Sequence, residues 1–309
     1  MPPYAACLLA STVCIALAAT GCSAASSPAS AGPADAGRPG DAGEAALDAG
    51  APTSCDDSHA ERPDGGTCVL EVEGTVADYT GTPLPGLLMT FCGPPQCYGS
   101  QADGTGAYVI PVGDYVRTGD FAVHVDGRPD HAVDYDRLSP GEPEVISVDI
   151  RTPVLPPSTV SLPANGAPAS EVTVGDVTLQ VAAGTTFTLD IEDFSLGAAG
   201  RLFRVASVPL ASAPPYAALN GVNAIYALAP SGAKPSTKMG VLVRNSAGLP
   251  ASSAVDVLVL SDDYFSNPPT VGTLVLAAKA HVSADGATIQ TDPGEGINEI
   301  TWLAVRKGI

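Results

Sequence analysis

Hydrophobic and polar residues alternate along much of the chain after residue 67, with the period of two that is typical of β-strands. Turn signals rich in Gly and Pro separate the first runs, at residues 80–86 and 102–106. This spacing predicts a small antiparallel β-sandwich, which we place at residues 55–151. Its clearest strand-like runs are "CVLEVEGTVAD" (68–78), "AYVIPV" (107–112), "FAVHVD" (121–126) and "VISVDI" (145–150).

A second set of strand-like runs predicts another β-sandwich at residues 171–309, including "AIYALAP", "MGVLVRN", "AVDVLVLSDD" and "EITWLAV". The run at 272–286 has an Ala-rich middle that could form a helical turn, but its bracketing glycines and its neighbours favour a strand. Between the two sets, the prolines of residues 152–170 could not sit in central strands and predict an extended link. The predicted fold class is all-β, with two antiparallel β-sandwich domains.

The N-terminal pattern is different, because residues 1–21 carry no charged side chain and residues 5–20 are apolar or small. Such a run is short for a bilayer span but suits the h-region of a signal peptide, which we predict at residues 1–21. The usual Lys or Arg of the n-region is missing, so either the free amino terminus supplies the charge or the true start lies upstream. Residues 22–54, rich in Ala, Gly, Pro, Ser and Asp, have little to bury and predict a disordered tether.

The cysteines indicate the cellular compartment in which the protein works. Cys55, Cys68, Cys92 and Cys97 form an even set, as expected for an exported protein with two disulfides. The favoured bridges are Cys92 with Cys97 and Cys55 with Cys68, out of three formal pairings. A zinc site at the C-x4-C spacing would need further ligands at finger spacing, which the neighbouring sequence does not supply.

Cys7 and Cys14 lie inside the predicted h-region and would be removed with it, so the even set leaves Cys22 as the unpaired cysteine of the mature chain. "ATGC" (19–22) resembles the lipobox of bacterial lipoproteins, with Gly21 directly before Cys22, although Ala19 stands where the family usually has Leu. The resemblance implies that Cys22 becomes the acylated N-terminus and anchors the protein to a membrane, with Ser23 at the next position compatible with outer-membrane sorting. The alternative is an ordinary secretory signal, which would leave a free thiol.

Residues 68–151 resemble the carboxypeptidase regulatory-like (transthyretin-like) β-sandwich family. Its two motifs are matched in order, by Gly74, Val76, Asp78, Gly81, Pro83, Leu84 and Gly86, and then by Asp103, Gly104, Gly106, Tyr108, Ile110 and Val112. The resemblance implies a spacing or binding module rather than a catalytic centre. Residues 222–302 more faintly resemble β-sandwich modules of bacterial surface proteins, through Pro230, Ser231, Gly232, Asn245, Gly248, Leu249 and Pro250, and no activity follows from that likeness.

Charge and candidate chemistry exclude several functions. The net charge of −19, with 14 Lys and Arg, excludes nucleic-acid binding through a basic patch. The nucleophile, zinc and phosphate-loop motifs G-x-S-x-G, H-E-x-x-H and the glycine-rich loops are absent from the sequence. We therefore predict no enzyme, no metal site and no cofactor. The stretch with His124, His131, Asp126, Asp130, Asp134 and Asp136 is interpreted as a solvated acidic loop, with calcium as the alternative, and Asp262 and Asp263 likewise.

Loop aromatics are the remaining candidates for ligand contact. Tyr79, Tyr98 and Tyr264 fall in predicted loops, whereas Trp302 lies in a run that predicts a buried strand. The predicted function is a membrane-anchored cell-envelope lipoprotein of the outer membrane, with a structural or adhesive role. The alternative is a carbohydrate- or peptide-binding accessory module with a glycan or protein partner in the envelope, and a secreted hydrolase with an unrecognised site ranks last.

Overall fold

The structure, a computed structural model, describes residues 52–55, 63–94 and 96–308. It confirms the all-β class, because sheets account for nearly all its regular structure. The strands are β1 (Thr67–Ala77), β2 (Leu88–Cys92), β3 (Cys97–Gln101), β4 (Ala107–Val116), β5 (Ala122–Asp126), β6 (Asp134–Arg137), β7 (Val145–Ser147), β8 (Ile150–Arg151), β9 (Ser170–Val174), β10 (Val177–Val181), β11 (Phe187–Thr188), β12 (Arg204–Val208), β13 (Ala224–Ala229), β14 (Lys234–Pro235), β15 (Gly240–Arg244), β16 (Ala254–Leu260), β17 (Leu274–Val282), β18 (Thr288–Thr291) and β19 (Leu303–Lys307).

Helical structure is brief. The two α-helices are α1 (Ile191–Ser195) and α2 (Pro215–Leu219), with 3₁₀ turns at Thr118–Asp120, Ala199–Arg201 and Leu210–Ser212. Within the described residues, no helix is both long and apolar enough to cross a membrane. Asp190 caps α1, its side chain accepting a hydrogen bond from the Ile191 amide, and Pro215 begins α2 at a position where its missing N–H costs little. Neither helix is predicted by the sequence pattern, since five residues are too few to show a helical period.

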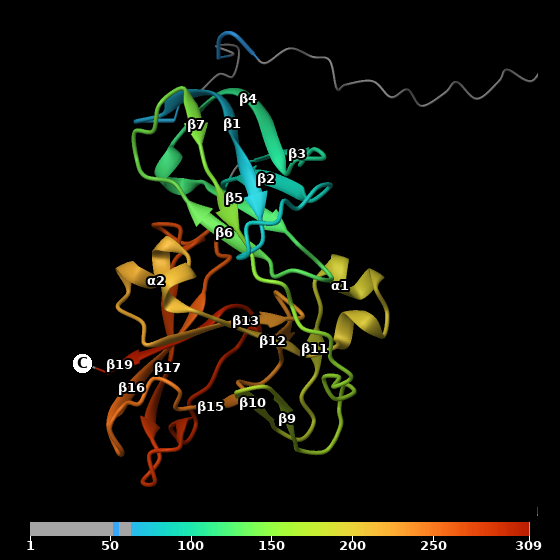
Figure 1. The fold of residues 1–309 in the computed structure, drawn as a ribbon, viewed down its shortest axis with the longest axis vertical. Helices are drawn as coiled ribbons and strands as arrows, with labels where there is room; N and C mark the ends of the chain where they lie inside the picture. Colours follow the sequence, from blue (N-terminus) through green and yellow to red (C-terminus); the bar gives the residue numbers. More distant parts are fainter. Residues whose placement is uncertain (1–51, 56–62, 95, 309) are drawn as a thin grey trace, which may run out of the picture. The chain divides into compact units, whose positions relative to one another are not determined.

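The first eight strands build two sheets that pack their apolar faces together. One contains β4, β1 and β7, with β8 also pairing with β1, and the other has the order β3-β2-β5-β6 (Figure 1). Val69, Val72 and Val76 of β1 are fully buried against a core that includes Phe91 and Ile110, and a β-bulge between Val69 and Glu71 turns Val69 to the same face as the other two. Pairing is antiparallel except at β7 and β8, which run parallel to β1. The expectation of a purely antiparallel sandwich is wrong at this edge, because the chain crosses over before β7 instead of returning through a hairpin.

Two glycines of the predicted motifs sit where a side chain cannot. A Cβ on Gly106, whose φ is +79°, would lie 2.5 Å from the carbonyl oxygen of Val76. A Cβ on Gly74 would lie 1.8 Å from the carbonyl oxygen of Val148, which also accepts a 2.6 Å hydrogen bond from Tyr108. Both positions therefore need glycine so that neighbouring segments can approach closely.

The later strands form a nine-stranded sheet with the order β12-β13-β19-β16-β17-β18-β15-β10-β9, and a short pair, β11 and β14. The Ala-rich run is strand β17, as predicted, and it pairs with β16 along its length. Trp302 is 1% exposed, which confirms its predicted burial. Most of the sheet's buried side chains belong to one cluster, which includes Phe203, Met239 and Leu303.

A further core cluster joins the turn between β5 and β6 and the segment after β8 to the later strands. Ala132 and Leu155 pack there with Tyr216, Leu258 and Trp302. The indole Nε1 of Trp302 donates a 2.7 Å hydrogen bond to the carbonyl oxygen of Val133. Gly50–Ile309 accordingly forms one compact unit, and the division into domains at residues 55–151 and 171–309 stays a prediction.

Both predicted disulfides are confirmed. Cys55 is bonded to Cys68, which fixes residue 55 to the beginning of β1. Cys92 is bonded to Cys97, and the two residues are also cross-strand neighbours at the end of the β2–β3 hairpin. β2 and β3 thus form a hairpin that is closed by its own disulfide.

Candidate functional site

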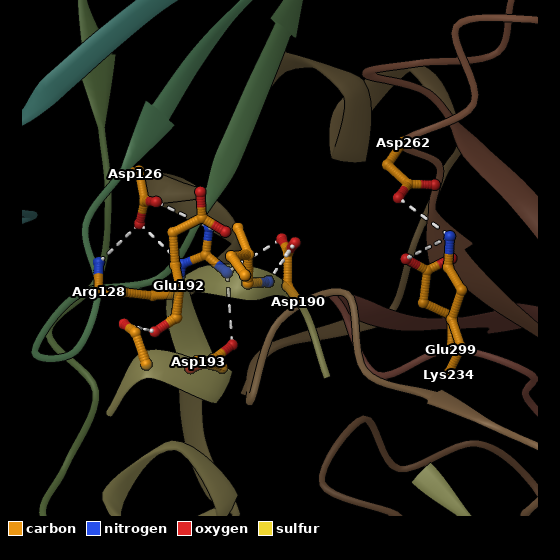
Figure 2. Close-up of polar contacts among 10 residues, drawn as sticks. Asp126, Arg128, Asp190, Glu192, Asp193, Lys234, Asp262 and Glu299 are labelled. Carbon is orange, nitrogen blue, oxygen red and sulfur yellow. Dashed lines mark hydrogen bonds and ion pairs between the residues drawn. The ribbon is translucent and has the colours of Figure 1, made fainter. Parts of the chain in front are cut away.

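Arg128 lies at the centre of a cluster of carboxylates. It belongs to the turn after β5, and its side chain is 7% exposed. Its Nε and Nη2 donate to the two carboxylate oxygens of Asp126 at 2.9 and 2.7 Å, a bidentate arrangement. Its Nη1 reaches Asp190 at 3.1 Å and Asp193 at 3.4 Å, and Glu192 lies 3.5 Å from Nη2 (Figure 2).

The local sequence of α1 explains how three carboxylates reach one guanidinium. Asp190 caps the helix, and Glu192 and Asp193 occupy its first turn, where the helix dipole favours negative charge. Burial raises the pKa of Asp193 to about 6 even though Arg128 lowers it. Burial also acts on Asp126, but the hydrogen bonds and charge of Arg128 outweigh it and hold the pKa of that carboxyl below its usual value.

Lys234 on β14 carries a second, more exposed ion-pair group. Its Nζ lies 3.4 Å from Asp262 and 3.8 Å from Glu299, and its side chain is 55% exposed (Figure 2). Burial and the nearby Asp262 raise the pKa of Glu299 to about 7. Together with the Arg128 group, six carboxylates face two cations, so this acidic cluster carries excess negative charge. Across the described residues, no group of three or more His, Cys, Asp or Glu side chains is arranged to hold a metal ion.

A separate cavity of about 160 Å³ lies beside Asp134. Asp134 is 4% exposed, and its Oδ1 accepts hydrogen bonds from Tyr216 Oη and from the Tyr135 amide, both at 2.8 Å. Burial raises the pKa of Asp134 to about 8, so this carboxyl is mostly protonated at neutral pH. Tyr79 also lines the cavity, and its hydroxyl is buried without a hydrogen-bond partner in the described part of the chain.

The predicted histidine–aspartate stretch is therefore not one solvated loop. Asp126 is bonded to Arg128 and Asp134 is buried, so the solvated interpretation is wrong for both. The ring of His124 stacks on Tyr135 with centroids 4.5 Å apart, and its Nδ1 lies 3.2 Å from Thr90 Oγ1. Burial lowers the pKa of His124 to about 4, which keeps the imidazole neutral at physiological pH.

The other predicted site residues lie in different surroundings. Tyr79 lines the cavity, and Tyr264 contacts the ring of Tyr135 edge-on with centroids 6.5 Å apart. Tyr98 lies on β3, where it stacks on Phe91 and donates a 2.9 Å hydrogen bond to Asp114. Asp263 accepts hydrogen bonds from two backbone amides of its own loop. Cys22, the predicted lipidation site, lies outside the described residues, as do the signal segment and most of the predicted tether.

Sequence reasoning missed Arg128, Tyr216 and Asp193. The contacts of Arg128 with α1 span 62 and 65 residues, and the Tyr216–Asp134 bond spans 82. Neither a hydrophobic period nor a local motif can predict contacts between residues so far apart in the sequence. The one available signal was an arginine inside an acidic turn, "DGRPD", which indicates ion pairing but does not identify the partners.

Apolar side chains are exposed next to the acidic cluster. On α1, Ile191 is 69% exposed and Phe194 is 70% exposed. Phe265, in the loop that carries Asp262, is 83% exposed. A contiguous apolar patch marks a surface that binds other molecules, whereas single exposed apolar side chains are common on any protein.

Comparison with known proteins adds little. No family model and no curated protein matches the chain. Among solved structures, a putative carbohydrate binding protein from Bacteroides uniformis is similar at 11% identity, over 77% of this chain and 78% of that one, with a TM-score of 0.21. A likeness of that degree carries no inference about function.

Proposed function

We propose that this chain is an exported lipoprotein, anchored through an acyl group on Cys22 to the cell envelope, at the outer membrane. Its role there is structural or adhesive rather than catalytic. The first strand set acts as a spacing or binding module of the carboxypeptidase regulatory-like type, and the later strands present an interaction surface.

The disulfides carry the proposal. Cys55, Cys68, Cys92 and Cys97 all pair with one another, and such bridges form and persist in oxidising compartments outside the cytosol. Of the three other cysteines in the sequence, Cys7 and Cys14 lie within the predicted leader, and Cys22 stands at the junction of that leader and the low-complexity tract. Acylation gives that cysteine a role that neither pairing nor packing supplies.

The non-catalytic part of the proposal rests on how the titratable groups are used. His124 stacks against Tyr135, and the carboxylates of the acidic cluster are held by Arg128 and Lys234. His281 forms a 2.8 Å pair with Asp292 at the surface, but no Ser or Cys hydroxyl or thiol in the described residues is hydrogen-bonded to that imidazole. A nucleophile beside its base would be the minimum for acyl transfer.

An adhesive role draws its support from the exposed side chains of Ile191, Phe194 and Phe265. For the alternative, glycan binding, the specific feature is a hollow of about 570 Å³ on the nine-stranded sheet, lined by polar side chains that include Gln180, Gln290 and Asp292. Amide and carboxylate groups of this kind suit the hydroxyls of a sugar. A glycan array with the wild type and Gln290→Ala distinguishes the two: retention of a glycan by the wild type alone favours the accessory module.

The anchor is tested by cell fractionation of a bacterial host that expresses the full chain. The wild type is expected in the membrane fraction, with an intact mass that fits an acylated N-terminus at Cys22. Cys22→Ser is expected to lose the acyl mass and leave the membrane, whereas Cys14→Ser, inside the predicted leader, keeps both properties. A wild-type product that is soluble and begins at another residue would contradict the proposal.

A further inference from the structure

A groove lies between the beginning of β2 and the helix α1. Its volume of about 320 Å³ corresponds to roughly ten water molecules of the liquid. Its lining includes three leucines, two carboxylates and one guanidinium: Leu87, Leu88, Leu196, Asp126, Glu192 and Arg128. The groove therefore has room for a long side chain of another molecule, and its lining is both apolar and charged.

Exposed leucines line the groove on both sides. Leu88 begins β2 and pairs with Asp126 on β5, so the two side chains lie on the same face of that sheet. On the α1 side, Glu192, Ser195 and Leu196 follow the i, i+3, i+4 spacing that places side chains on one face of a helix. Leu88 and Leu196 are both exposed. The two sides thus contribute to one apolar lining, and each also carries a carboxylate.

The apolar surface continues on the solvent side of α1. Ile191 and Phe194, both exposed, lie three residues apart and therefore on the same side of the helix. Each is the sequence neighbour of a residue that lines the groove, Glu192 and Ser195 respectively. Apolar side chains that gather in this way, unlike scattered ones, mark a surface on which another molecule docks.

The charges of the groove favour a basic occupant. Arg128 is the only cation among the described residues that line it, and its three side-chain nitrogens already donate to carboxylates (Figure 2). Four carboxylates lie around this one guanidinium, which leaves excess negative charge. Glu192 has the longest of these contacts, at 3.5 Å, and its side chain is 47% exposed. Glu192 is therefore the carboxylate most open to a second cation.

Lysine and arginine side chains match both properties of the groove. Each combines an apolar stem with a cationic head, so the stem can pack on Leu88 and Leu196 while the head reaches Glu192. A metal ion would use the carboxylates but not the leucines. Within the described residues, moreover, no group of acidic side chains is arranged to hold one.

We propose that this groove docks a segment of a partner protein in which a lysine or arginine is flanked by apolar residues. The basic side chain enters the groove, and its apolar neighbours pack on Ile191 and Phe194. The proposal rests on the adhesive role proposed above and names its surface and the chemistry of its partner. It does not depend on the anchor at Cys22.

Synthetic peptides test the chemistry of the partner. The probe is acetyl-Gly-Ser-Leu-Arg-Leu-Ser-Gly-amide, titrated into the purified full chain and followed by NMR. In one control peptide neutral citrulline replaces the arginine, and in the other serine replaces both leucines. Saturable shifts at groove residues are expected with the probe, and binding of either control should be about tenfold weaker or more. Equal binding of the leucine-free peptide would mean that acidic charge alone attracts the probe, and would overturn the proposal.

Substitutions at exposed positions localise the docking site. Leu88→Ser should weaken binding of the probe about fivefold or more. Leu276→Ser is its matched control, because Leu276 is 51% exposed on β17 and Leu88 is 46% exposed on β2, and it should change nothing. Glu192→Gln should weaken binding of the probe about fivefold but not that of the citrulline peptide. Its matched control is Glu295→Gln, whose side chain is 39% exposed and lies outside the groove.

The possible failures of this proposal and of the proposed function can be told apart. Probe binding that survives both Leu88→Ser and Glu192→Gln would overturn the groove as the docking site, while an adhesive role at another surface would stand. No binding of the probe would also overturn the proposal. The anchor is tested separately, by the fractionation of Cys22→Ser, and neither peptide result bears on it.

Discussion

Asp126 and Asp134 lie on the same β5–β6 hairpin, yet their surroundings give the two carboxyls opposite properties. Both carboxyls are largely removed from water: the side chain of Asp126 is 12% exposed, and Asp134 as a whole residue is 4% exposed. Asp126 has a bidentate arginine, and its pKa falls below the ordinary value. Asp134 accepts hydrogen bonds from a tyrosine hydroxyl and a backbone amide but forms no ion pair with a described residue, and its pKa rises to about 8.

The difference lies in what the rest of the chain brings to each residue. Desolvation opposes ionisation at both positions, and the hydrogen bonds and positive charge of Arg128 reverse the outcome at Asp126. Arg128 supplies that charge to Asp126 and to the carboxylates of α1. The negative charge of the Arg128 cluster is therefore partly neutralised, and the cluster joins the turn after β5 to α1. We call it the compensated cluster. Asp134, which lines a cavity and has no such ion pair among the described residues, is the uncompensated acid.

The largest effect is expected from removing the cation of the compensated cluster. Arg128→Ala leaves Asp126 and Asp193 buried without their partner, which should lower the free energy of unfolding by about 3 kcal/mol. Chemical denaturation at pH 7 measures it. Arg244→Ala is the matched control, since its pair with Asp176 is 3.9 Å long and Arg244 is 76% exposed, and it should cost under about 0.5 kcal/mol. Equal costs for the two variants would refute a special role for Arg128.

The second prediction concerns the uncompensated acid and pH. The native pKa of Asp134, about 8, lies above its unfolded value, about 4. The native state therefore holds the proton more tightly, and this group's contribution to stability is full below about pH 4 and is lost as pH rises to about 8. Stability relative to Asp134→Asn should fall with rising pH over that window, by at most about 1.4 kcal/mol per unit. A constant difference between the two proteins from pH 5 to pH 8 would contradict the raised pKa.

A smaller effect should follow from removing the hydroxyl that bonds Asp134. Tyr216→Phe keeps the ring against Trp302 but loses the 2.8 Å hydrogen bond, at a cost of about 1 kcal/mol. Because that bond favours the ionised carboxyl, the pKa of Asp134 should rise further. Denaturation and an NMR titration measure the two effects, and a lower pKa of Asp134 in the variant would show that the bond acts in the opposite direction.

The smallest effect is expected at Lys234, the half-exposed cation of the acidic cluster. Lys234→Ala should cost about 0.5 kcal/mol, because exposed pairs are screened by water and salt. The pKa of Glu299 should rise above about 7, since Lys234 lowers it. A loss of stability as great as that of Arg128→Ala would show that the half-exposed ion pairs of Lys234 stabilise the fold as much as the buried ion pairs of Arg128.

The sequence predicts the strands far better than the sites. Most of β17 and the first half of β4 alternate clearly, because one face of each strand is turned toward a core, and that periodicity is local; in β1 a bulge interrupts it. The disulfides follow from an even cysteine count and short spacings. The contacts of Arg128 with α1 and of Tyr216 with Asp134 join residues more than sixty positions apart, and only the packing of the two strand sets brings them together. The burial of Asp134 has the same origin, which is why a solvated loop was the natural expectation.

The contrast between these two acids can be measured directly by a carbon-detected NMR titration of the aspartate carboxyl groups. The expected result is a midpoint near pH 8 for Asp134 and a midpoint below the ordinary value of about 4 for Asp126. Titration of both carboxyls together near pH 4 would contradict it, and would mean that neither burial at Asp134 nor Arg128 at Asp126 acts as the structure indicates.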